Sequence, residues 1–336
     1  MKIRLPTALP AALLAIAGLI PATMLAPGAA LAQDKPITLR LGHILPEASL
    51  YHASALKFVE ALTKNSGGRI KVDIFPNAQL GFERDLIEGM RLGTVDAGVI
   101  TAAPLSGFEP RMMVLDLPFI FKTRESAFKV MDGEIGKRLF GYLEAQNLKG
   151  LAYFDAGWRT VVSTKKPLAK PEDYAGTRFR VLENPLYVAT FKSLGVNATP
   201  MNFGEVYTGL RQGTIDALDL PVYVVHSAKI YEVAKYMAMT EHMLTPVVLM
   251  MSNAKFKSLP ADLQQAVVKS AQEVTAPQRQ FALDTNADLL NKLRDLKMEI
   301  VQVPDKRPFQ EKMQSVYREF EGKIGRDLIS AVQAAQ

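Results

Sequence analysis

Three arginines lie in stretches whose pattern predicts strands, and arginine is the side chain best suited to hold a carboxylate. Arg178 and Arg180 alternate with apolar residues, so both guanidinium groups leave the same face of an extended segment. Arg159 directly follows Trp158 at the start of another extended segment. A guanidinium is planar, permanently charged and offers paired N–H donors that match the two oxygens of a carboxylate. Two interpretations fit this pattern, a carboxylate-binding site and a solvated face of a sheet.

Residue patterns typical of catalysis are missing from the sequence. It contains no G-x-S-x-G, Walker, G-x-G-x-x-G or H-E-x-x-H motif. It has no cysteine, which excludes disulfides and thiolate metal sites, and its four histidines lack metal-ligand spacing. One of them, His43, ends the first predicted strand, where it either faces a cleft or forms a structural hydrogen bond. We expect no metal, no cofactor and no catalytic residue, although acid and base groups can also come from distant positions.

The elements that would position these side chains alternate between strands and helices. Alternating hydrophobicity predicts strands at 37–44, 70–74, 95–101, 151–154, 160–163 and 178–182. Helical spacing or composition predicts helices at 55–62, 82–92 and 123–147. Strands that alternate with helices indicate an α/β fold with a largely parallel sheet.

A short internal repeat supports two lobes of similar design. The segment 89–97, Gly-Met-Arg-Leu-Gly-Thr-Val-Asp-Ala, is matched by 209–217, Gly-Leu-Arg-Gln-Gly-Thr-Ile-Asp-Ala. The likeness either reflects the shared chemistry of helix–glycine–strand joints or marks the same step in each of two lobes. Because ligands of open α/β sheets sit beyond the carboxyl ends of the strands, two such lobes would form a cleft.

The last third of the chain predicts long helices. One helix begins near Pro260 and its apolar pattern runs to about residue 298, with Pro277 inside it as an expected kink or break. A helix of this length suits a strut that crosses both lobes. A strand at 299–303 and a helix at 308–335 follow. We place lobe I at 33–157 plus about 246–285, and lobe II at 158–245 plus about 286–336.

The first 32 residues have the parts of a secretory signal peptide. Lys2 and Arg4 precede an apolar run at 11–20, and Ala30-Leu31-Ala32 provides a cleavage site before Gln33. The run is about half of the ~20 residues that a membrane span needs. We therefore expect a periplasmic protein that begins near Gln33 after cleavage.

The charge balance of the remaining chain is mild. Removing Lys2 and Arg4 leaves 38 basic residues against 34 acidic ones, a net charge of +4. Basic runs with interleaved aromatic residues do not occur, which argues against a nucleic-acid partner. The balance is compatible with a small anionic ligand, and a monomer is the default expectation.

The chain resembles the solute-binding subunits of tripartite ATP-independent periplasmic (TRAP) transporters, the DctP-like family. The motifs that carry the resemblance extend along the whole mature chain. They are Ser66-Gly67-Gly68-Arg69, Phe75-Pro76-Asn77-Ala78-Gln79-Leu80-Gly81, Leu117-Pro118-Phe119, Gly176-x-x-Phe179-Arg180-Val181, Pro200-Met201-x-Phe203-x-Glu205-Val206-Tyr207 and Leu259-Pro260. The resemblance implies two α/β lobes with a central ligand cleft, a long helix that crosses both lobes, and a bound organic acid that is delivered to a membrane permease without catalysis.

The resemblance also implies which residues hold the ligand. Arg180 matches the arginine that pairs with the ligand carboxylate, and Arg159 matches a second arginine that supports this pairing. Phe203 matches an aromatic pocket wall, although burial in a core would explain it equally. The other residues that we expect at or near the pocket are Glu83, Thr101, His43, Trp158, Glu183 and Asn184.

One departure from the family pattern concerns the segment 216–221, Asp-Ala-Leu-Asp-Leu-Pro. Many relatives carry an amide that often touches the ligand at the position of Leu220, so the identity of the solute cannot be transferred from them. Asp219 either turns into the cleft, where it accepts from a ligand hydroxyl or amine, or caps a local turn. An exported hydrolase or isomerase that acts on a small organic acid is the alternative function.

Overall fold

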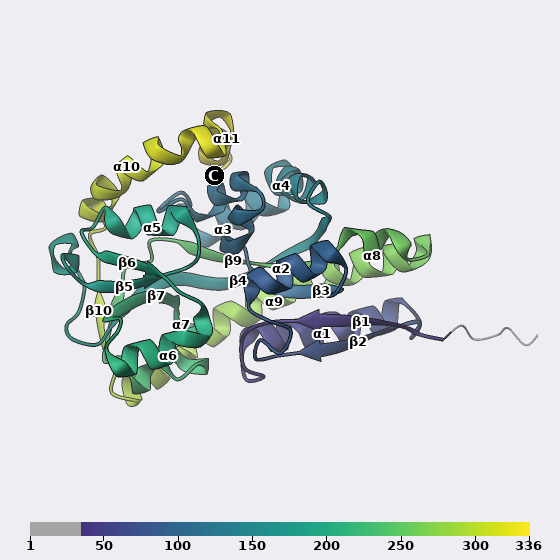
Figure 1. Cartoon of the computed structure of the whole chain (residues 1–336), viewed down its shortest axis with the longest axis horizontal. Coiled ribbons are helices and arrows are strands. Elements are labelled where there is room, and N and C mark those ends of the chain that lie inside the picture. The colour runs from purple at the N-terminus through teal and green to yellow at the C-terminus, as the bar shows by residue number, and fades with distance from the viewer. Residues whose placement is uncertain (1–34) are drawn as a thin grey trace, which may run out of the picture. The chain divides into compact units, whose positions relative to one another are not determined.

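A mixed β-sheet forms the centre of the protein (Figure 1). The computed structural model describes residues 35–336, so the signal peptide expected at 1–32 lies outside the described residues. The strands are β1 (Ile37–Gly42), β2 (Ile70–Phe75), β3 (Ala97–Thr101), β4 (Leu148–Ser163), β5 (Arg178–Val181), β6 (Asn197–Pro200), β7 (Ala217–Pro221), β8 (Tyr236–Met239), β9 (Leu244–Ser252) and β10 (Glu299–Gln302). Their order within this part of the chain is β2-β1-β3-β9-β4-β7-β5-β6, with β8 beside β4 and β10 beside β8.

The sheet is mixed rather than largely parallel: among the described residues five strand pairs are parallel, including β8 with β10, and four are antiparallel. Strand β1 runs parallel to β2 and β3, and β5 runs parallel to β6 and β7. Strand β9 is antiparallel to β3 and β4, and β4 is antiparallel to β7 and β8. Each end of the sheet therefore has the parallel α/β pattern, and the two ends are joined by antiparallel strands.

Strand β4 is one continuous strand that belongs to both ends of the sheet. We expected separate strands at 151–154 and 160–163, whereas β4 extends from Leu148 to Ser163. Its residues up to Trp158 pair with β9, and those from Arg159 onward pair with β7 and β8. We call the strands β2, β1, β3, β9 and the first part of β4 the first half of the sheet. The second half consists of the rest of β4 with β5, β6, β7, β8 and β10.

Strand β9 had no periodic signal in the sequence. Its nine residues are all buried, so the strand reads as a continuous apolar run rather than an alternation. Pro246, which cannot donate to a ladder, lies beside the irregular register between Asp155 and Trp158 of β4, where pairing is already interrupted.

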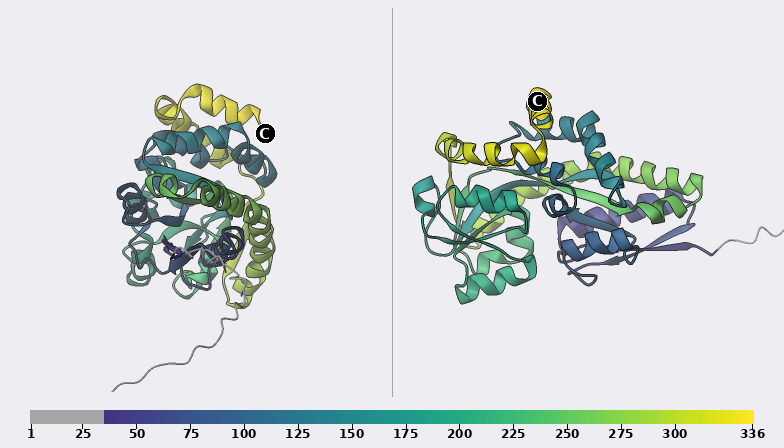
Figure 2. Two further views of the ribbon diagram at one scale, coloured as in Figure 1. Left: turned by 90° about the vertical axis from the view of Figure 1, so that its right-hand side faces the viewer. Right: turned by 45° about the horizontal axis from the view of Figure 1, so that its top comes forward.

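Helices cover both faces of the sheet, as Figure 2 shows from two further sides. They are α1 (Leu50–Asn65), α2 (Glu83–Leu92), α3 (Arg124–Asp132), α4 (Glu134–Glu144), α5 (Pro185–Lys192), α6 (Phe203–Gln212), α7 (Val222–Ser227), α8 (Asn253–Ser258), α9 (Ala261–Asp295), α10 (Arg307–Ile324) and α11 (Arg326–Ala334). Short 3₁₀ segments are η1 (Ala103–Gly107), η2 (Pro110–Asp116), η3 (Pro171–Tyr174) and η4 (Ile230–Glu232).

Two hydrophobic cores lie on opposite faces of the sheet. One combines side chains of α2, α3, α4, α5, α10 and α11, and the other combines those of α1, α6, α7 and α9. Successive residues of β9 contribute alternately to the two, as Val248 and Leu249 do. Because alternate side chains of a strand point to opposite faces, the fold has three layers, helices–sheet–helices.

Two long helices predicted from the sequence are each divided at a glycine. The segment 123–147 forms α3 and α4, separated at Gly133, where a Cβ would lie 2.9 Å from the Lys129 carbonyl oxygen. The segment 308–335 forms α10 and α11, separated at Gly325. Gly325 has φ 99°, a left-handed conformation that ends a helix and that other residues adopt at a cost.

The helix α9 passes through Pro277 without a break, and its axis curves in Figure 2. It packs on α1, β4 and α7, and so contacts elements at both ends of the sheet. The Gln278 side chain holds it to β4, because its amide bonds the backbone N–H and C=O of Asp155, each at 2.9 Å. The predicted strut is present, whereas the lobe boundaries stay a prediction because residues 36–336 form one compact unit.

The internal repeat marks the same helix–strand joint in both halves of the sheet. Helix α2 ends at Gly93 with φ 80°, and α6 ends at Gly213 with φ 71°. In each joint a threonine N–H donates to a glycine carbonyl five residues earlier at 2.9 Å, from Thr94 and Thr214 respectively.

Between residues 35 and 336 no helix combines the length and the hydropathy required to span a membrane.

Candidate ligand-binding site

A cavity lies beyond the carboxyl ends of the parallel strands β1, β3, β5 and β7, and residues at or just after the end of each strand line it. It holds about 380 Å³ of space, including its opening to solvent. Its polar lining residues are Tyr51, Glu83, Thr101, Arg159, Arg180, Tyr223 and Thr245. Its apolar lining residues are Ile44, Leu45, Leu182, Phe203, Leu220, Pro221 and Val224. Both halves of the sheet therefore contribute to the cavity.

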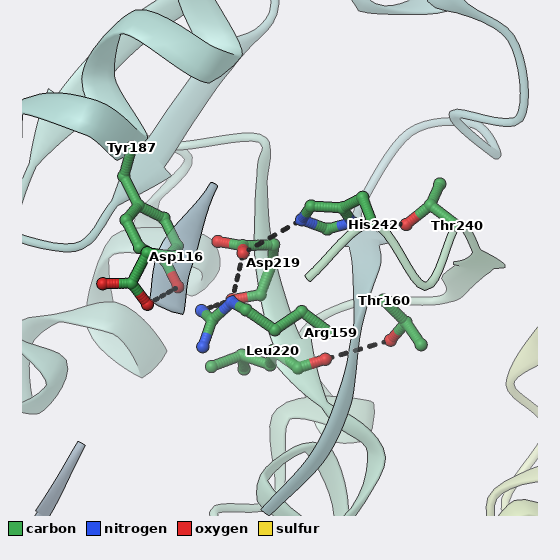
Figure 3. A network of polar contacts seen from close by, with 8 residues as sticks. All are labelled: Asp116, Arg159, Thr160, Tyr187, Asp219, Leu220, Thr240 and His242. Atoms are coloured by element: carbon green, nitrogen blue, oxygen red, sulfur yellow. Dashed lines mark hydrogen bonds and ion pairs between the residues drawn. The ribbon is translucent and has the colours of Figure 1, made fainter. Parts of the chain in front are cut away.

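Arg159 is a buried cation whose charge is matched. Its Nε donates to the Asp219 carboxylate, and its Nη2 donates to the Asp219 carbonyl oxygen at 2.7 Å (Figure 3). Burial by itself would lower the pKa of Arg159, but Asp219 outweighs it and the pKa is raised. Arg159 and Asp219 lie on the adjacent strands β4 and β7, so the sheet itself aligns the pair.

A histidine supports the Asp219 carboxylate from the other side. His242 Nε2 lies 3.3 Å from the carboxylate oxygen that accepts from Arg159, and its Nδ1 lies 2.8 Å from the Thr240 hydroxyl (Figure 3). Burial opposes ionisation of Asp219, but Arg159 and His242 outweigh it and hold the pKa well below its usual range. Asp219 therefore points at Arg159 rather than into the cavity.

Arg180 differs from Arg159 because its charge is not matched. Its Nε and Nη2 both donate to the Met201 carbonyl oxygen, at 3.0 and 2.8 Å. Within residues 35–336 no carboxylate forms an ion pair with it, although only 4% of the residue is exposed. Burial and the charge of Arg159 lower the pKa of Arg180 to about 10. A buried guanidinium held in this way is poised to bind an anion.

Glu83 and two tyrosines also line the cavity. Glu83 begins α2, and its Oε1 accepts from the Thr101 backbone N–H at 2.6 Å. Burial raises the pKa of this carboxyl. The Thr101 hydroxyl lies 2.8 Å from the Tyr51 hydroxyl, and the Tyr51 ring lies 6.2 Å from that of Tyr223.

Five of the nine residues that we expected at the ligand line this cavity. They are Arg180, Arg159, Phe203, Glu83 and Thr101. Glu183, which we expected at the rim, lines a recess that shares Glu83 and Arg180 with the cavity. The ligand-contacting roles of these residues stay predictions.

The other four expected residues lie outside the lining. Asp219 supports Arg159, as described. His43 forms the structural hydrogen bond that was one of its two interpretations, with its Nε2 3.0 Å from His52 Nδ1. Trp158 packs against the core that contains α10, and Asn184 caps α5 by accepting from the Leu186 N–H at 2.8 Å.

Asn184 also links the two halves of the sheet. Its Nδ2 donates to the carbonyl oxygen of Ala103 in η1 at 3.0 Å, and it lies 3.4 Å from Asp116 of η2. Asp116 is fully buried and also lies 3.5 Å from the Tyr187 hydroxyl (Figure 3). Burial raises the pKa of Asp116 to about 7.

Sequence reasoning missed three polar lining residues, Tyr51, Tyr223 and Thr245. Tyr51 lies in α1 and Tyr223 in α7, where nothing in the spacing distinguishes a pocket residue from a core aromatic residue. Thr245 is in β9, the strand without a periodic signal. In the part of the chain that is described, no three His, Asp or Glu side chains are grouped closely enough to hold a metal.

Comparison with known proteins places the chain in a family. Residues 41–323 match the sequence model of DctP, the bacterial extracellular solute-binding proteins of family 7. The chain belongs to the DctP family of TRAP periplasmic solute-binding proteins. Members of this family are binding proteins rather than enzymes, so the exported hydrolase or isomerase is set aside.

Three similar proteins illustrate which ligands are bound by proteins of this family. The 2,3-diketo-L-gulonate-binding periplasmic protein YiaO of Escherichia coli is 35% identical over 89% of this chain and 92% of its own. The C4-dicarboxylate-binding periplasmic protein DctP of Rhodobacter capsulatus is 29% identical over 90% of this chain and 91% of its own. A TRAP solute-binding protein from Polaromonas, bound to D-erythronate, superposes with a TM-score of 0.86 at 34% identity, covering 89% of this chain and 98% of that one. The DctP resemblance and the α/β fold with its long helix are thereby confirmed.

Proposed function

We propose that this DctP-family protein binds a small organic acid in the cavity between the two halves of the sheet, with the ligand carboxylate on Arg180. Arg159 contributes its Nη1, which forms no hydrogen bond within residues 35–336, to the same carboxylate. Phe203 forms an apolar wall beside the ligand, and Glu83 and Thr101 contact its far end. The relatives named above bind a keto acid, C4-dicarboxylates and D-erythronate, so a carboxylate is the feature that their ligands share.

The observation that carries this proposal is the unmatched charge of Arg180. Arg159, on β4, has its own carboxylate partner, whereas no carboxylate among residues 35–336 pairs with Arg180 on β5. Burying a carboxylate is costly unless it is paired, and Arg180 provides the pairing. The gain is complete only when side chains from both halves surround the ligand, so binding favours a closed arrangement over an open one.

We further propose the cellular context that the family implies. The protein is exported to the periplasm after cleavage near Gln33, acts as a monomer, and delivers its ligand to the membrane permease subunits of a TRAP transporter during ion-gradient-driven uptake. The permease would recognise the closed, loaded protein. Deleting the gene should abolish uptake of the acid that the purified protein binds, and uptake that continues unchanged would contradict this role.

Isothermal titration calorimetry with a panel of organic acids tests the binding site. Replacing Arg180 by alanine should cost about 2–5 kcal/mol of binding free energy, because the ligand carboxylate is left buried without a partner. The affinity should fall by tens- to thousands-fold while the thermal unfolding midpoint shows that the variant is folded. The matched control is Arg178→Ala, on the same strand, because Arg178 is exposed and pairs with Asp216 instead. Wild-type affinity in the Arg180 variant would refute the proposal.

A further inference from the structure

The recess beside the ligand cavity leads from Arg180 to solvent between the two halves of the sheet. It holds about 300 Å³ of space, including its opening. It shares Arg180, Glu83 and Phe203 with the cavity. Its other lining residues include Phe82, which precedes α2 in the first half, and the exposed Glu183, which follows β5 in the second half. Movement of one half relative to the other therefore changes the width of this opening.

The side chain of Phe82 reaches from the first half to the second at this recess. Helix α2 connects β2 to β3, whereas α6, which contains Gly204 in its first turn, connects β6 to β7. A Cβ atom built on Gly204 would lie 2.6 Å from Cζ and 2.8 Å from Cε1 of the Phe82 ring. Both distances are well inside van der Waals contact. The tip of the ring therefore occupies space beside α6 that is open only because residue 204 is glycine.

The backbone of Gly204 does not explain why this residue is glycine. Its φ is not positive, unlike that of Gly213 at the end of the same helix. Gly204 is also exposed, and at an exposed helical position alanine is the better helix former. The close approach of the Phe82 ring is the feature of the structure that requires glycine here.

The backbone of Phe82 is held in place and cannot easily give way. Its N–H donates to the Asp85 carboxylate at 2.9 Å, and its carbonyl oxygen accepts from the Leu86 N–H at 2.9 Å. These two bonds cap α2 at its first residue. The ring can therefore make room for a larger residue 204 only by rotating about its own side-chain bonds or by a separation of the two halves.

We propose that the Phe82 ring and Gly204 form a closure contact, which is made when the two halves close over a ligand and which a side chain at position 204 would prevent. This rests on the proposed function, in which the ligand lies in the adjoining cavity. Both are positioning residues, because neither is among the residues that line that cavity. A contact made only in the closed arrangement increases the affinity for a ligand that it does not touch.

The variant Gly204→Ala tests the closure contact in isothermal titration calorimetry with D-erythronate, 2,3-diketo-L-gulonate and succinate. Its methyl group overlaps the Phe82 ring, so the affinity for each acid that the wild type binds should fall about tenfold. The thermal unfolding midpoint should not fall, because alanine favours the helix. A glycine with a merely structural role would give the reverse result, a lower midpoint with unchanged affinity.

The variant Phe82→Ala shows whether the two residues act through each other. By itself it should weaken binding several-fold, because the closed arrangement loses the ring. Adding Gly204→Ala to it should change the affinity by less than about twofold, because the methyl group then meets no ring. The controls are Gly141→Ala in α4 and Gly322→Ala in α10, two exposed helical glycines whose added Cβ would have no atom of the described residues within 4 Å. They should leave the affinity unchanged.

The outcomes distinguish this inference from the proposed function. Unchanged affinity in Gly204→Ala would overturn the closure contact. An equal tenfold loss from Gly204→Ala in the wild type and in the Phe82→Ala background would overturn it as well. In either case, loss of acid binding in Arg180→Ala would leave the proposed function standing. Acid binding that survives Arg180→Ala would overturn the proposed function itself.

Discussion

Replacing Asp219 by asparagine should destabilise the protein strongly, because it leaves the Arg159 charge buried without its partner. The side chains of Arg159 and Asp219 are 3% and 0% exposed, so water cannot replace the lost carboxylate. Breaking such a pair typically costs 3–5 kcal/mol. Asparagine retains an oxygen that can accept from the guanidinium, which places the expected loss near the lower limit, about 3 kcal/mol.

The matched control is Asp216→Asn, a change of the same chemistry outside the cavity. Asp216 pairs with Arg178 at 2.6 Å, and the Arg178 side chain is 46% exposed. Because solvent reaches the Arg178 guanidinium and screens its pairing with the Asp216 side chain, which is 10% exposed, this substitution should cost less, about 1 kcal/mol. Urea unfolding followed by the fluorescence of Trp158, the single tryptophan, measures both variants by linear extrapolation.

The stabilisation of the fold by the Asp219 carboxylate should decrease at low pH. The folded-state pKa of Asp219 lies below its ordinary value of 3.8, so the stabilisation is present above that value and lost as the pH falls through the folded pKa. The difference between the wild type and Asp219→Asn should therefore be constant from about pH 5 to 8 and shrink below about pH 4. Equal losses for the two aspartate variants at neutral pH would refute the matched-charge account of Arg159.

Two further predictions concern the contacts behind the cavity. Burial raises the pKa of Asp116 from its ordinary 3.8 to about 7, so between these two values the folded state binds a proton that the unfolded state releases. The free energy of unfolding should therefore fall by up to ~4 kcal/mol as the pH rises from about 4 to 7. Asp116→Asn should remove this decline in urea unfolding at pH 5 and 8, and an unaltered pH dependence would contradict the assignment. Asn184→Ala should cost about 1 kcal/mol through loss of the α5 cap and should also weaken calorimetric ligand binding, since the Asn184 side chain donates to Ala103 across the two halves. Lower stability with unchanged affinity would show that this contact does not favour closure.

Local patterns were sufficient for most of the helices and strands. The helix–glycine–strand joints at Gly93 and Gly213 could be predicted from the sequence because a left-handed turn favours glycine. The same reasoning applies to Gly325, which is left-handed, but not to Gly133, which is extended; at both positions the apolar pattern continues on each side and conceals the break. The fully buried β9 shows the opposite problem, because a strand with two apolar faces has no period.

The roles of the two arginines could not be separated from the sequence. Arg159 and Arg180 both lie on strands, both are buried, and both line the cavity. Their difference depends on Asp219, which is 60 residues from Arg159 and becomes its neighbour only because β4 and β7 pair. Thr245 likewise lies at the cavity only because its strand, β9, pairs with β4.

The amino-acid sequence by itself determined the α/β class, the long crossing helix, the family, and the arginine suited to a carboxylate. Each of these depends on residue type and on spacing within a short segment, and such information is local. The tertiary structure alone decided which charges are matched and which predicted residues reach the cavity. These depend on distances between strands that are far apart in the chain, and strand pairing and burial set those distances.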